Sequence, residues 1–226
     1  MSVAAGVDGC KGGWVMVRRY VERGTADFMI FQRWRDLPSA DMVAVDMPIG
    51  LPESGPRGCD KLARRMLGPR GASVFLGLRR PLLDFETYDR ARLWAREDGF
   101  GLSKQAWYLL PKIRELDEAL SPGNQERIRE THPELAFLAL QGSPLEHSKK
   151  SPEGLKTRMD LLRENGFGRI TNWIGILDTS HASADDLLDA CALALSAERM
   201  LKNKGVRLPA DEPPRDARGL RMEIWY

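Results

Sequence analysis

Long hydrophobic runs are missing from this sequence of 226 residues, and cysteine is scarce. No apolar stretch approaches the roughly 20 residues that a membrane-spanning helix needs. The three cysteines, Cys10, Cys59 and Cys191, are far apart and form no C-x-x-C pair, so neither a disulfide framework nor a zinc site is indicated. The first apolar run begins about two residues from the N-terminus, which leaves no room for a secretory signal. We therefore expect a soluble, cytoplasmic protein without a membrane partner.

A strong net charge is also absent. The formal net charge of +2 is too small to indicate a polyanionic partner by itself. The segment from Arg57 to Arg80 differs, because it contains seven Lys and Arg residues and the single acid Asp60. This basic segment is either a solvated surface, as charge runs usually are, or a surface that contacts phosphates.

The first 33 residues have the pattern of an antiparallel meander. Val3–Asp8 is a run of small and β-branched residues, a glycine-rich turn follows, and Trp14–Val17 is again apolar. This pattern predicts a hairpin, to which Ala26–Gln32 adds a third strand. Asp8 then lies where the first strand ends, beside glycines that allow a metal ion or a phosphate to come close.

A second aspartate ends the next predicted strand. Met42–Met47 is an apolar run typical of a strand buried on both faces in a parallel arrangement. The prolines in Pro48–Pro52 end this strand near Asp46. If it runs parallel to the first strand and beside it, the carboxylates of Asp8 and Asp46 lie at the same edge of the sheet. Two such carboxylates repel each other and raise a pKa unless a cation lies between them.

The middle of the chain is predicted to be mostly helical. Helical patterns cover Cys59–Leu67, Phe85–Asp98 and Ser103–Leu120, whereas Ala72–Phe75 is predicted to be extended. Pro111 interrupts the last pattern, either as a kink or as the first residue of a new helix. The length of the chain does not require two domains, so we expect one.

Further acids occur in the C-terminal half. Ile128–Thr131 predicts a short strand, and Glu134 follows it at the start of a helix. The helix predicted over Ala184–Lys202 is apolar almost all round and should pack inside the protein. Asp186 and Asp189 share one face of this helix. Helix capping explains Asp186, but an unpaired Asp189 among apolar neighbours would be costly.

The remaining segments are less distinctive. Ser143–Pro152 is polar and rich in turn residues, and we expect it to expose Lys149 and Lys150. A helix is predicted over Glu153–Glu164. Leu220–Tyr226 alternates like a final edge strand.

Ordinary structural roles explain four of these acids poorly, Asp8, Asp46, Glu134 and Asp189, and Asp186 shares a helix face with the last of them. Such hard oxygen ligands suit Mg²⁺ or Mn²⁺, which keep several waters and accept substrate phosphates. The predicted order is three antiparallel strands, a parallel strand, helices, a further strand and a late acidic helix. This order resembles the ribonuclease H-like fold, an α/β architecture with a mixed sheet flanked by helices.

Particular residues carry the resemblance. Gly6–Asp8 is similar to the first-strand acid of RuvC-type resolvases, and Asp186–Ala194 is similar to their late-helix acidic motif. The whole chain more closely resembles the family called domain of unknown function 429, a predicted nuclease group. The stretches that resemble this family are Gly6–Val15, Val43–Pro52, Arg57–Phe75, Gly101–Asp117, His132–Gly142, Ser148–Arg158 and Asp185–Ala194.

The resemblance implies a single ribonuclease H-like domain over residues 1–226, with a basic, largely helical insertion at about 53–125. RuvC-type enzymes lack this long middle segment. The resemblance also implies a catalytic set of carboxylates, in which the metal ligands are Asp8, Asp46, Glu134 and Asp189, with Asp186 assisting.

Our hypothesis is two-metal hydrolysis of phosphodiester bonds in DNA or RNA, in which one ion activates a water and the other stabilises the leaving oxygen. The side chains that would contact phosphates or neutralise the transition state are Lys11, Arg64, Arg70, Ser73, Lys149 and Lys150. Two alternatives stay open. One is an actin-like phosphotransferase or ATPase, which also begins with a strand, an acid and a glycine-rich hairpin. The other is a non-catalytic module that binds nucleic acid or a protein through the basic segment.

Overall fold

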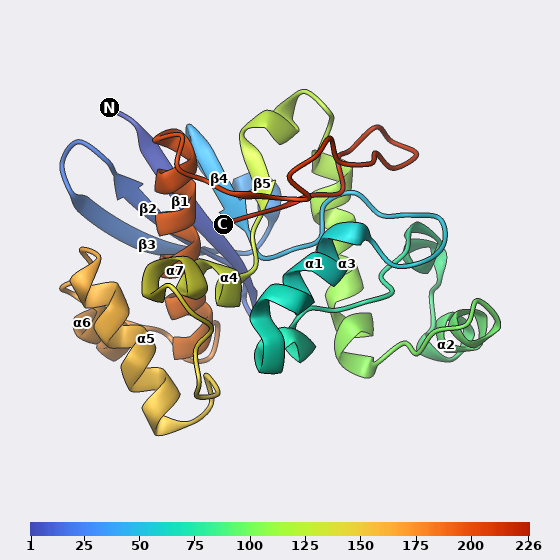
Figure 1. Ribbon diagram of the computed structural model, residues 1–226. Helices are drawn as coiled ribbons and strands as arrows, with labels where there is room; N and C mark the ends of the chain where they lie inside the picture. The colour runs from blue at the N-terminus through green and yellow to red at the C-terminus, as the bar shows by residue number, and fades with distance from the viewer.

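A mixed five-stranded sheet forms the centre of the computed structural model, which describes residues 1–226 (Figure 1). Its strands are β1 (Val3–Cys10), β2 (Gly13–Tyr20), β3 (Thr25–Phe31), β4 (Met42–Val45) and β5 (Ile128–Glu130). They are ordered β3-β2-β1-β4-β5 across the sheet. The first three form an antiparallel meander, while β4 is parallel to β1 and β5 is parallel to β4. The predicted meander and the predicted parallel strand beside β1 are both confirmed.

Helices pack against this sheet on both faces, so the protein is of the α/β class (Figure 1). The helices are α1 (Gly58–Leu67), α2 (Tyr88–Glu97), α3 (Lys104–Ala119), α4 (Pro133–Gln141), α5 (Pro152–Glu164), α6 (Ile170–Ile176) and α7 (Ala184–Leu201). Short 3-10 helices occur at Trp34–Asp36, Gly68–Ser73, Arg80–Asp84 and Asn124–Glu126. No helix is both long enough and apolar enough to cross a membrane.

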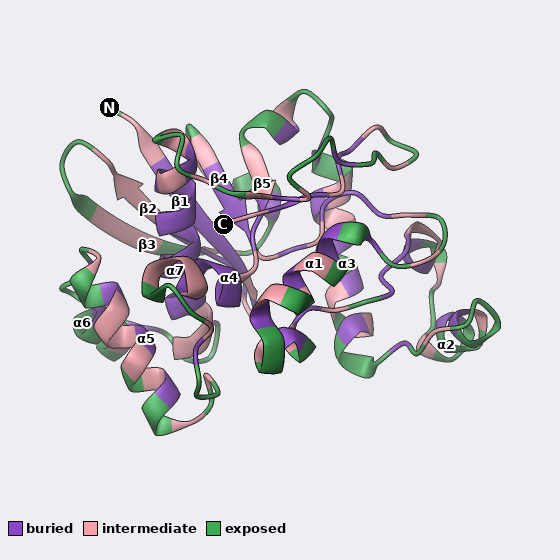
Figure 2. Cartoon of the chain, in the orientation of Figure 1, coloured by how far each residue is buried: buried purple, intermediate pink, exposed green.

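On one face of the sheet, α7 runs across β1, β2 and β4 (Figure 1). The helix backbone touches β1 at Gly6, where a Cβ atom would lie 2.1 Å from the carbonyl oxygen of Ala190 and 2.3 Å from the amide nitrogen of Ala194. From Leu187 to Ala197 every residue of α7 is buried, as the apolar pattern predicts, and Figure 2 shows this helix largely in the colour of buried residues. This packing brings the acidic first turns of α7 to the end of β1.

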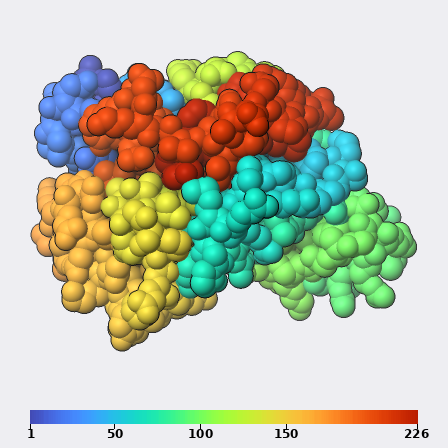
Figure 3. All heavy atoms as spheres, in the orientation of Figure 1, coloured from blue at the N-terminus to red at the C-terminus, as the bar shows by residue number.

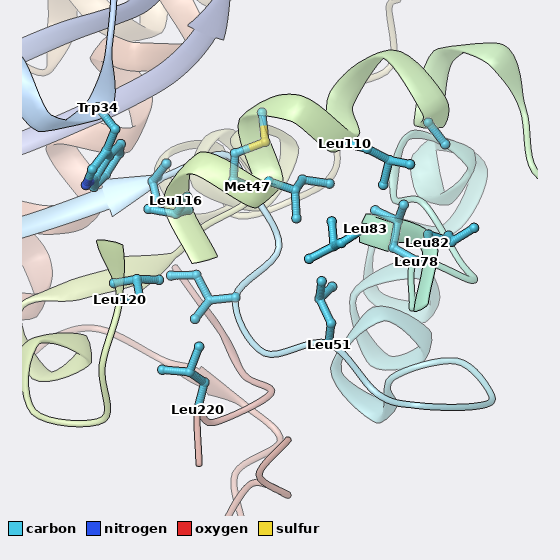
Figure 4. Close-up of a cluster of buried hydrophobic side chains, with 14 of the residues drawn as sticks. Trp34, Met47, Leu51, Leu78, Leu82, Leu83, Leu110, Leu116, Leu120 and Leu220 are labelled. Carbon is cyan, nitrogen blue, oxygen red and sulfur yellow. The ribbon is translucent and has the colours of Figure 1, made fainter. Parts of the chain in front are cut away.

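The other face of the sheet packs on α3. Because successive side chains of a strand point to opposite faces, Ala5 and Val7 of β1 join a core with Ile113 and Leu116 of α3, away from α7. The indole nitrogen of Trp14 also donates to the Glu115 carboxylate over 2.9 Å. Figure 4 shows side chains of this core pointing toward one another from several elements, among them Met47, Leu51, Leu82, Leu110, Leu120 and Leu220. This core connects the middle of the chain to the sheet.

The middle segment differs from its prediction in three places. α3 continues through Pro111, so no new helix begins there. Pro111 is exposed, and the hydrogen bond that a proline cannot make is lost on the solvent side of the helix, where the cost is smallest. α2 begins at Tyr88 rather than Phe85, because Phe85 is extended and packs on the core. Ala72 and Ser73 belong to a 3-10 helix, and the extended prediction holds only from Val74.

The C-terminal tail does not form an edge of the main sheet. Only Ile224–Trp225 is a strand, β7, and it pairs with β6 (Arg207–Leu208) in a separate two-stranded sheet. The alternating charged residues of the tail are buried in ion pairs, Arg221 with Glu126 at 2.6 Å and Glu223 with Arg129 at 2.9 Å. Such buried charges cannot form the solvent face of an edge strand. Figure 3 shows the C-terminal residues, in red, lying across one face of the molecule.

Candidate functional site

A cleft of about 330 Å³ lies at the carboxyl ends of β1 and β4, bordered by α4, α7 and the segment after α1. All five predicted catalytic carboxylates line it. Its acidic side chains are Asp8, Asp46, Asp60, Glu130, Glu134, Asp186 and Asp189, and its cationic side chains are Arg57, Arg70 and Lys149. The cleft is therefore acidic, although the chain as a whole has a formal charge of +2.

The pairing of β1 with β4 places Asp8 and Asp46 at one edge of the sheet. Val7 is opposite Val45, and the amide of Asp46 donates to the carbonyl oxygen of Val7 over 3.0 Å. The carboxylate of Asp8 accepts a hydrogen bond from the amide of Gly9 at 2.7 Å. No side chain donates a hydrogen bond to either carboxylate. Both anions are therefore poorly compensated.

Burial is the main cause of a raised pKa at both aspartates. It holds the pKa of Asp8 well above its usual range, and the charges of Asp46, Asp189 and Asp186 add to the effect. Burial likewise raises the pKa of Asp46 to about 7, where Lys149 opposes the shift and Glu134 adds to it. The ionised forms of these groups are thus disfavoured without a compensating cation.

Asp189 faces the same cleft from α7 and has a cationic partner. The Nζ atom of Lys149 donates to Oδ2 of Asp189 over 2.7 Å, and the Asp189 side chain is only 3% exposed. Burial raises the pKa of Asp189 to about 6 despite this partner. Lys149 was expected to be exposed, but it is half-buried, because its ammonium group turns inward to the carboxylates.

Asp186 lines the cleft and also caps the N-terminus of α7. Its Oδ2 atom accepts from the amide of Ser183 at 2.8 Å, and the Ser183 hydroxyl accepts from the amide of Asp186 at 3.2 Å. This reciprocal arrangement is a capping box that begins α7. One carboxylate oxygen of Asp186 is therefore occupied in capping.

Glu134, in the first turn of α4, has one satisfied oxygen and one unsatisfied oxygen. Oε1 accepts from Arg158 at 2.6 Å and from Arg70 at 3.1 Å. Oε2 is buried and has no hydrogen-bond partner. His132 caps this helix, since its Nδ1 accepts from the amide of Glu134 at 3.2 Å, while burial lowers the pKa of the imidazole. His132 thus has a structural role, and Glu134 has a free acceptor at the cleft.

The predicted phosphate-binding side chains divide into two groups. Arg70, Ser73 and Lys149 line the cleft, although the hydroxyl of Ser73 donates to the carbonyl oxygen of Arg70 at 2.8 Å. The other three do not line it. Lys11 is exposed on the first hairpin, Lys150 is exposed, and Arg64 donates to the carbonyl oxygen of Val74.

A buried ionic network in the wall of the cleft was not predicted. The guanidinium of Arg57 lies 2.5 Å from Asp60 and 2.6 Å from Glu130, and Glu130 also accepts from the amide of Ile49 at 2.7 Å. These bonds hold the loop that follows Asp46. Glu130 ends a strand parallel to β4, so the strand-end criterion that selected Asp8 and Asp46 would also have found it.

Arg158 is a second residue that the sequence interpretation missed. Its side chain is 1% exposed, and besides Glu134 it reaches the carbonyl oxygens of His147 and Gly154 at 3.2 and 3.1 Å. The sequence pattern could have indicated its burial, because Arg158 lies on the apolar face of α5 with Leu162. A cation in that position needs a buried partner.

The carboxylates suit a hard divalent cation by their chemistry, since aspartate and glutamate oxygens are the ligands that Mg²⁺ and Mn²⁺ prefer. The unsatisfied Oε2 of Glu134 and the carboxylates of Asp8 and Asp46, which lack side-chain donors, have acceptor capacity for an ion. As the side chains stand, no group of three or more His, Cys, Asp or Glu residues is arranged to hold one together. The ammonium of Lys149 is the cation nearest to Asp189.

Two amides of the glycine-rich hairpin already have hydrogen-bond partners within the protein. The amide of Gly9 donates to Asp8, and the amide of Gly12 donates to the carbonyl oxygen of His181 over 2.6 Å. Phosphate loops depend on free backbone amides. Neither of these two amides is available to a phosphate in this arrangement.

Comparison with curated proteins and with solved structures finds no match. The family model described as "Protein of unknown function (DUF429)" matches residues 6–214, which include all five predicted catalytic carboxylates. The chain therefore belongs to this family of proteins of unknown function.

Proposed function

We propose that this protein is a metal-dependent nuclease of ribonuclease H-like fold that hydrolyses phosphodiester bonds of nucleic acid in the acidic cleft. One observation carries the proposal: carboxylates from the ends of β1 and β4 and from α7 lie in one cleft. This cleft is lined by seven Asp and Glu side chains but only three Lys and Arg side chains. The order of the sheet supports the fold assignment, because an antiparallel meander is followed by strands parallel to β1.

The electrostatics of the cleft favour a bound divalent cation. Buried carboxylates without enough counter-charge cost free energy, and the raised pKa of Asp46, about 7, and of Asp189, about 6, reflect that cost. A structural role does not require such a cluster, because α7 and the two strands already pack through apolar side chains. Metal binding is a function that does require it.

Asp8, Asp46, Asp189 and Oε2 of Glu134 are the groups that would hold the metal. When bound, Mg²⁺ or Mn²⁺ lowers the pKa of a water for attack on phosphorus and stabilises the charge on the leaving oxygen. Asp8 is held by its pairing with Val15, and the backbone of Asp46 is held by its hydrogen bond to Val7. Arg70 on the cleft wall can orient a phosphate through its planar guanidinium.

An acidic cleft repels a polyanion. We therefore expect nucleic acid to enter the cleft only with divalent cations, so that metal binding and substrate binding are linked. This linkage distinguishes the proposal from a binding module that uses basic residues alone, since such a module would bind nucleic acid in the presence of a chelator.

The test is cleavage of single-stranded, duplex, hybrid and branched nucleic acids with Mg²⁺ or Mn²⁺. Wild type should cleave at least one of these substrates, and Asp8→Asn and Asp46→Asn should each reduce the rate by about 10²-fold or more. Asp36→Asn is the matched control, because Asp36 is exposed and does not line the cleft. If no substrate is cleaved and Mn²⁺ binds wild type and both variants equally, the proposal is wrong.

A further inference from the structure

Lys149 is the one cation that forms an ion pair with the aspartate cluster, which consists of Asp8, Asp46, Asp186 and Asp189. Its Nζ atom lies 2.7 Å from Oδ2 of Asp189. Burial opposes the charge on Lys149, yet the pKa of its ammonium is raised, because Asp189, Asp8 and Asp46 all attract it. A single ammonium therefore interacts with three carboxylates, which is the electrostatic role that a divalent cation would have.

The backbone that carries Lys149 is held in place. Arg158 donates to the carbonyl oxygen of His147 over 3.2 Å, and a Cβ atom on Gly154 would lie 1.9 Å from the carbonyl oxygen of Ser148. The Lys149 side chain, by contrast, has a flexible four-carbon stem and is 38% exposed. Its ammonium can leave Asp189 for solvent or for a ligand without any movement of the fold.

We propose that Lys149 is a built-in counter-cation, which neutralises the aspartate cluster in the metal-free protein and is displaced from Asp189 when a divalent cation binds. The inference rests on the proposed metal site and concerns its regulation. Lys149 and the metal compete for the same carboxylate, so the lysine stabilises the empty site and lowers its affinity for the metal. The displaced ammonium stays on the cleft wall, where it can contact a phosphate of the substrate.

Competition makes a prediction that a supporting role for Lys149 does not make. Removal of the lysine should destabilise the metal-free protein and yet tighten metal binding, because the ion no longer has to displace a cation. If Lys149 only held the site in shape, its removal would weaken metal binding.

The test is a calorimetric titration with Mn²⁺ of wild type, Lys149→Met and the matched control Lys150→Met, with the melting temperature of each measured in chelator. Lys150 is the neighbouring residue, is exposed and forms no ion pair. We expect Lys149→Met to bind Mn²⁺ about tenfold more tightly than wild type and to melt at a lower temperature in chelator. Lys150→Met should match wild type in both measurements.

The possible failures are distinguishable. Absence of Mn²⁺ binding to all three proteins would overturn the metal site, and the proposed function with it. If wild type binds Mn²⁺ as tightly as Lys149→Met or more tightly, the proposed displacement of Lys149 is wrong. The proposed metal site would not be contradicted by that result.

A second measurement needs no variant, in case Lys149→Met does not fold. Acylation of lysine amines in the wild-type protein, followed by mass spectrometry of peptides, reports whether each lysine side chain is held in an ion pair or is free to react. Lys149 should react several-fold faster with saturating Mn²⁺ than in chelator, while Lys150 provides an internal reference that does not change. Equal reactivity of Lys149 in the two conditions would contradict displacement.

Discussion

A Cβ atom on Gly6 of β1 would lie 2.1 Å from the carbonyl oxygen of Ala190 in α7. This contact is between two backbones, so no side-chain rotation can relieve it. The next residue of α7 toward its N-terminus is Asp189, and Asp8 lies two positions beyond Gly6 on the same face of the strand. The closeness of helix and strand at Gly6 therefore controls how the two aspartates meet.

Substitution Gly6→Ala should consequently affect both stability and metal binding. The added methyl group must displace α7, and overpacking of this kind should lower the free energy of unfolding by about 3 kcal/mol. Urea unfolding measures this change, and Mn²⁺ titration should show weaker binding. Gly168→Ala is the control, because a Cβ atom there meets nothing within 4 Å, and it should change stability by about 0.5 kcal/mol or less. Similar effects of the two substitutions would contradict the role of Gly6.

Local patterns in the sequence were sufficient to predict the elements that carry the aspartates. Apolar and β-branched runs with glycine and proline boundaries predicted β1 to β4, and the apolar composition of α7 predicted its burial. Asp8 and Asp46 could be selected because the end of an apolar run is a local feature, and parallel pairing then brings two such ends together. β1 itself continues to Cys10, two residues beyond the predicted end at Asp8, because Asp8 pairs with Val15 in the hairpin. This part of the cleft required no knowledge of distant contacts.

The partners of the carboxylates could not be predicted in the same way. Lys149 reaches Asp189 across 40 positions of sequence, and Arg57 reaches Glu130 across 73. The sequence alone does not show that either cation is turned inward, since long charged side chains are normally exposed. Only the three-dimensional packing decides which of them turn inward.

Asp8→Asn should make the metal-free protein more stable, although Asp8 is proposed as a metal ligand. The substitution removes a buried anion that lacks a side-chain donor and is repelled by its neighbours, and functional sites commonly gain about 1 kcal/mol from such changes. In Mn²⁺ the order should reverse, because the variant loses the stabilisation that comes with metal binding. Thermal melts with chelator and with Mn²⁺ measure both effects. A lower melting temperature of Asp8→Asn in chelator would argue that Asp8 has a structural role.

Arg158→Met should be strongly destabilising because it leaves Glu134 buried without its nearest cation. Removal of one partner of a buried ion pair costs about 3 kcal/mol or more, and Arg158 is 1% exposed. The comparison is Arg163→Met on the same helix, whose pair with Asp160 is about 40% exposed on both sides and should contribute less than about 1 kcal/mol. Urea unfolding distinguishes the two.

Replacement of both partners gives the control for this pair. The double variant Arg158→Met with Glu134→Leu also removes the buried anion, which Arg158→Met leaves with Arg70 as its only cationic partner, so it should recover part of the stability that Arg158→Met loses. If the double variant is less stable than Arg158→Met alone, the loss arises from packing or from the bonds of Arg158 to backbone carbonyls rather than from the poorly compensated charge of Glu134.

The stability of the metal-free protein should depend on pH through the aspartate cluster. Burial raises the pKa of Asp46 from 3.8 to about 7 and the pKa of Asp189 to about 6 in the folded protein. Between these values and the unfolded value near 3.8, the folded state binds more protons than the unfolded state, so the free energy of unfolding falls as pH rises. The contribution of these groups is fully present below the unfolded pKa and is lost above about pH 7.

Melting temperatures measured in chelator between about pH 5 and pH 8 test this dependence. Wild type should lose stability across this range, and Asp46→Asn, which cannot bind or release the proton, should lose less. With saturating Mn²⁺ the sign should change, because metal binding requires deprotonated carboxylates and strengthens as they ionise. The stabilisation by Mn²⁺ should therefore grow with pH in wild type more than in Asp46→Asn. Parallel curves for the two proteins, with and without Mn²⁺, would show that Asp46 is not the titrating group.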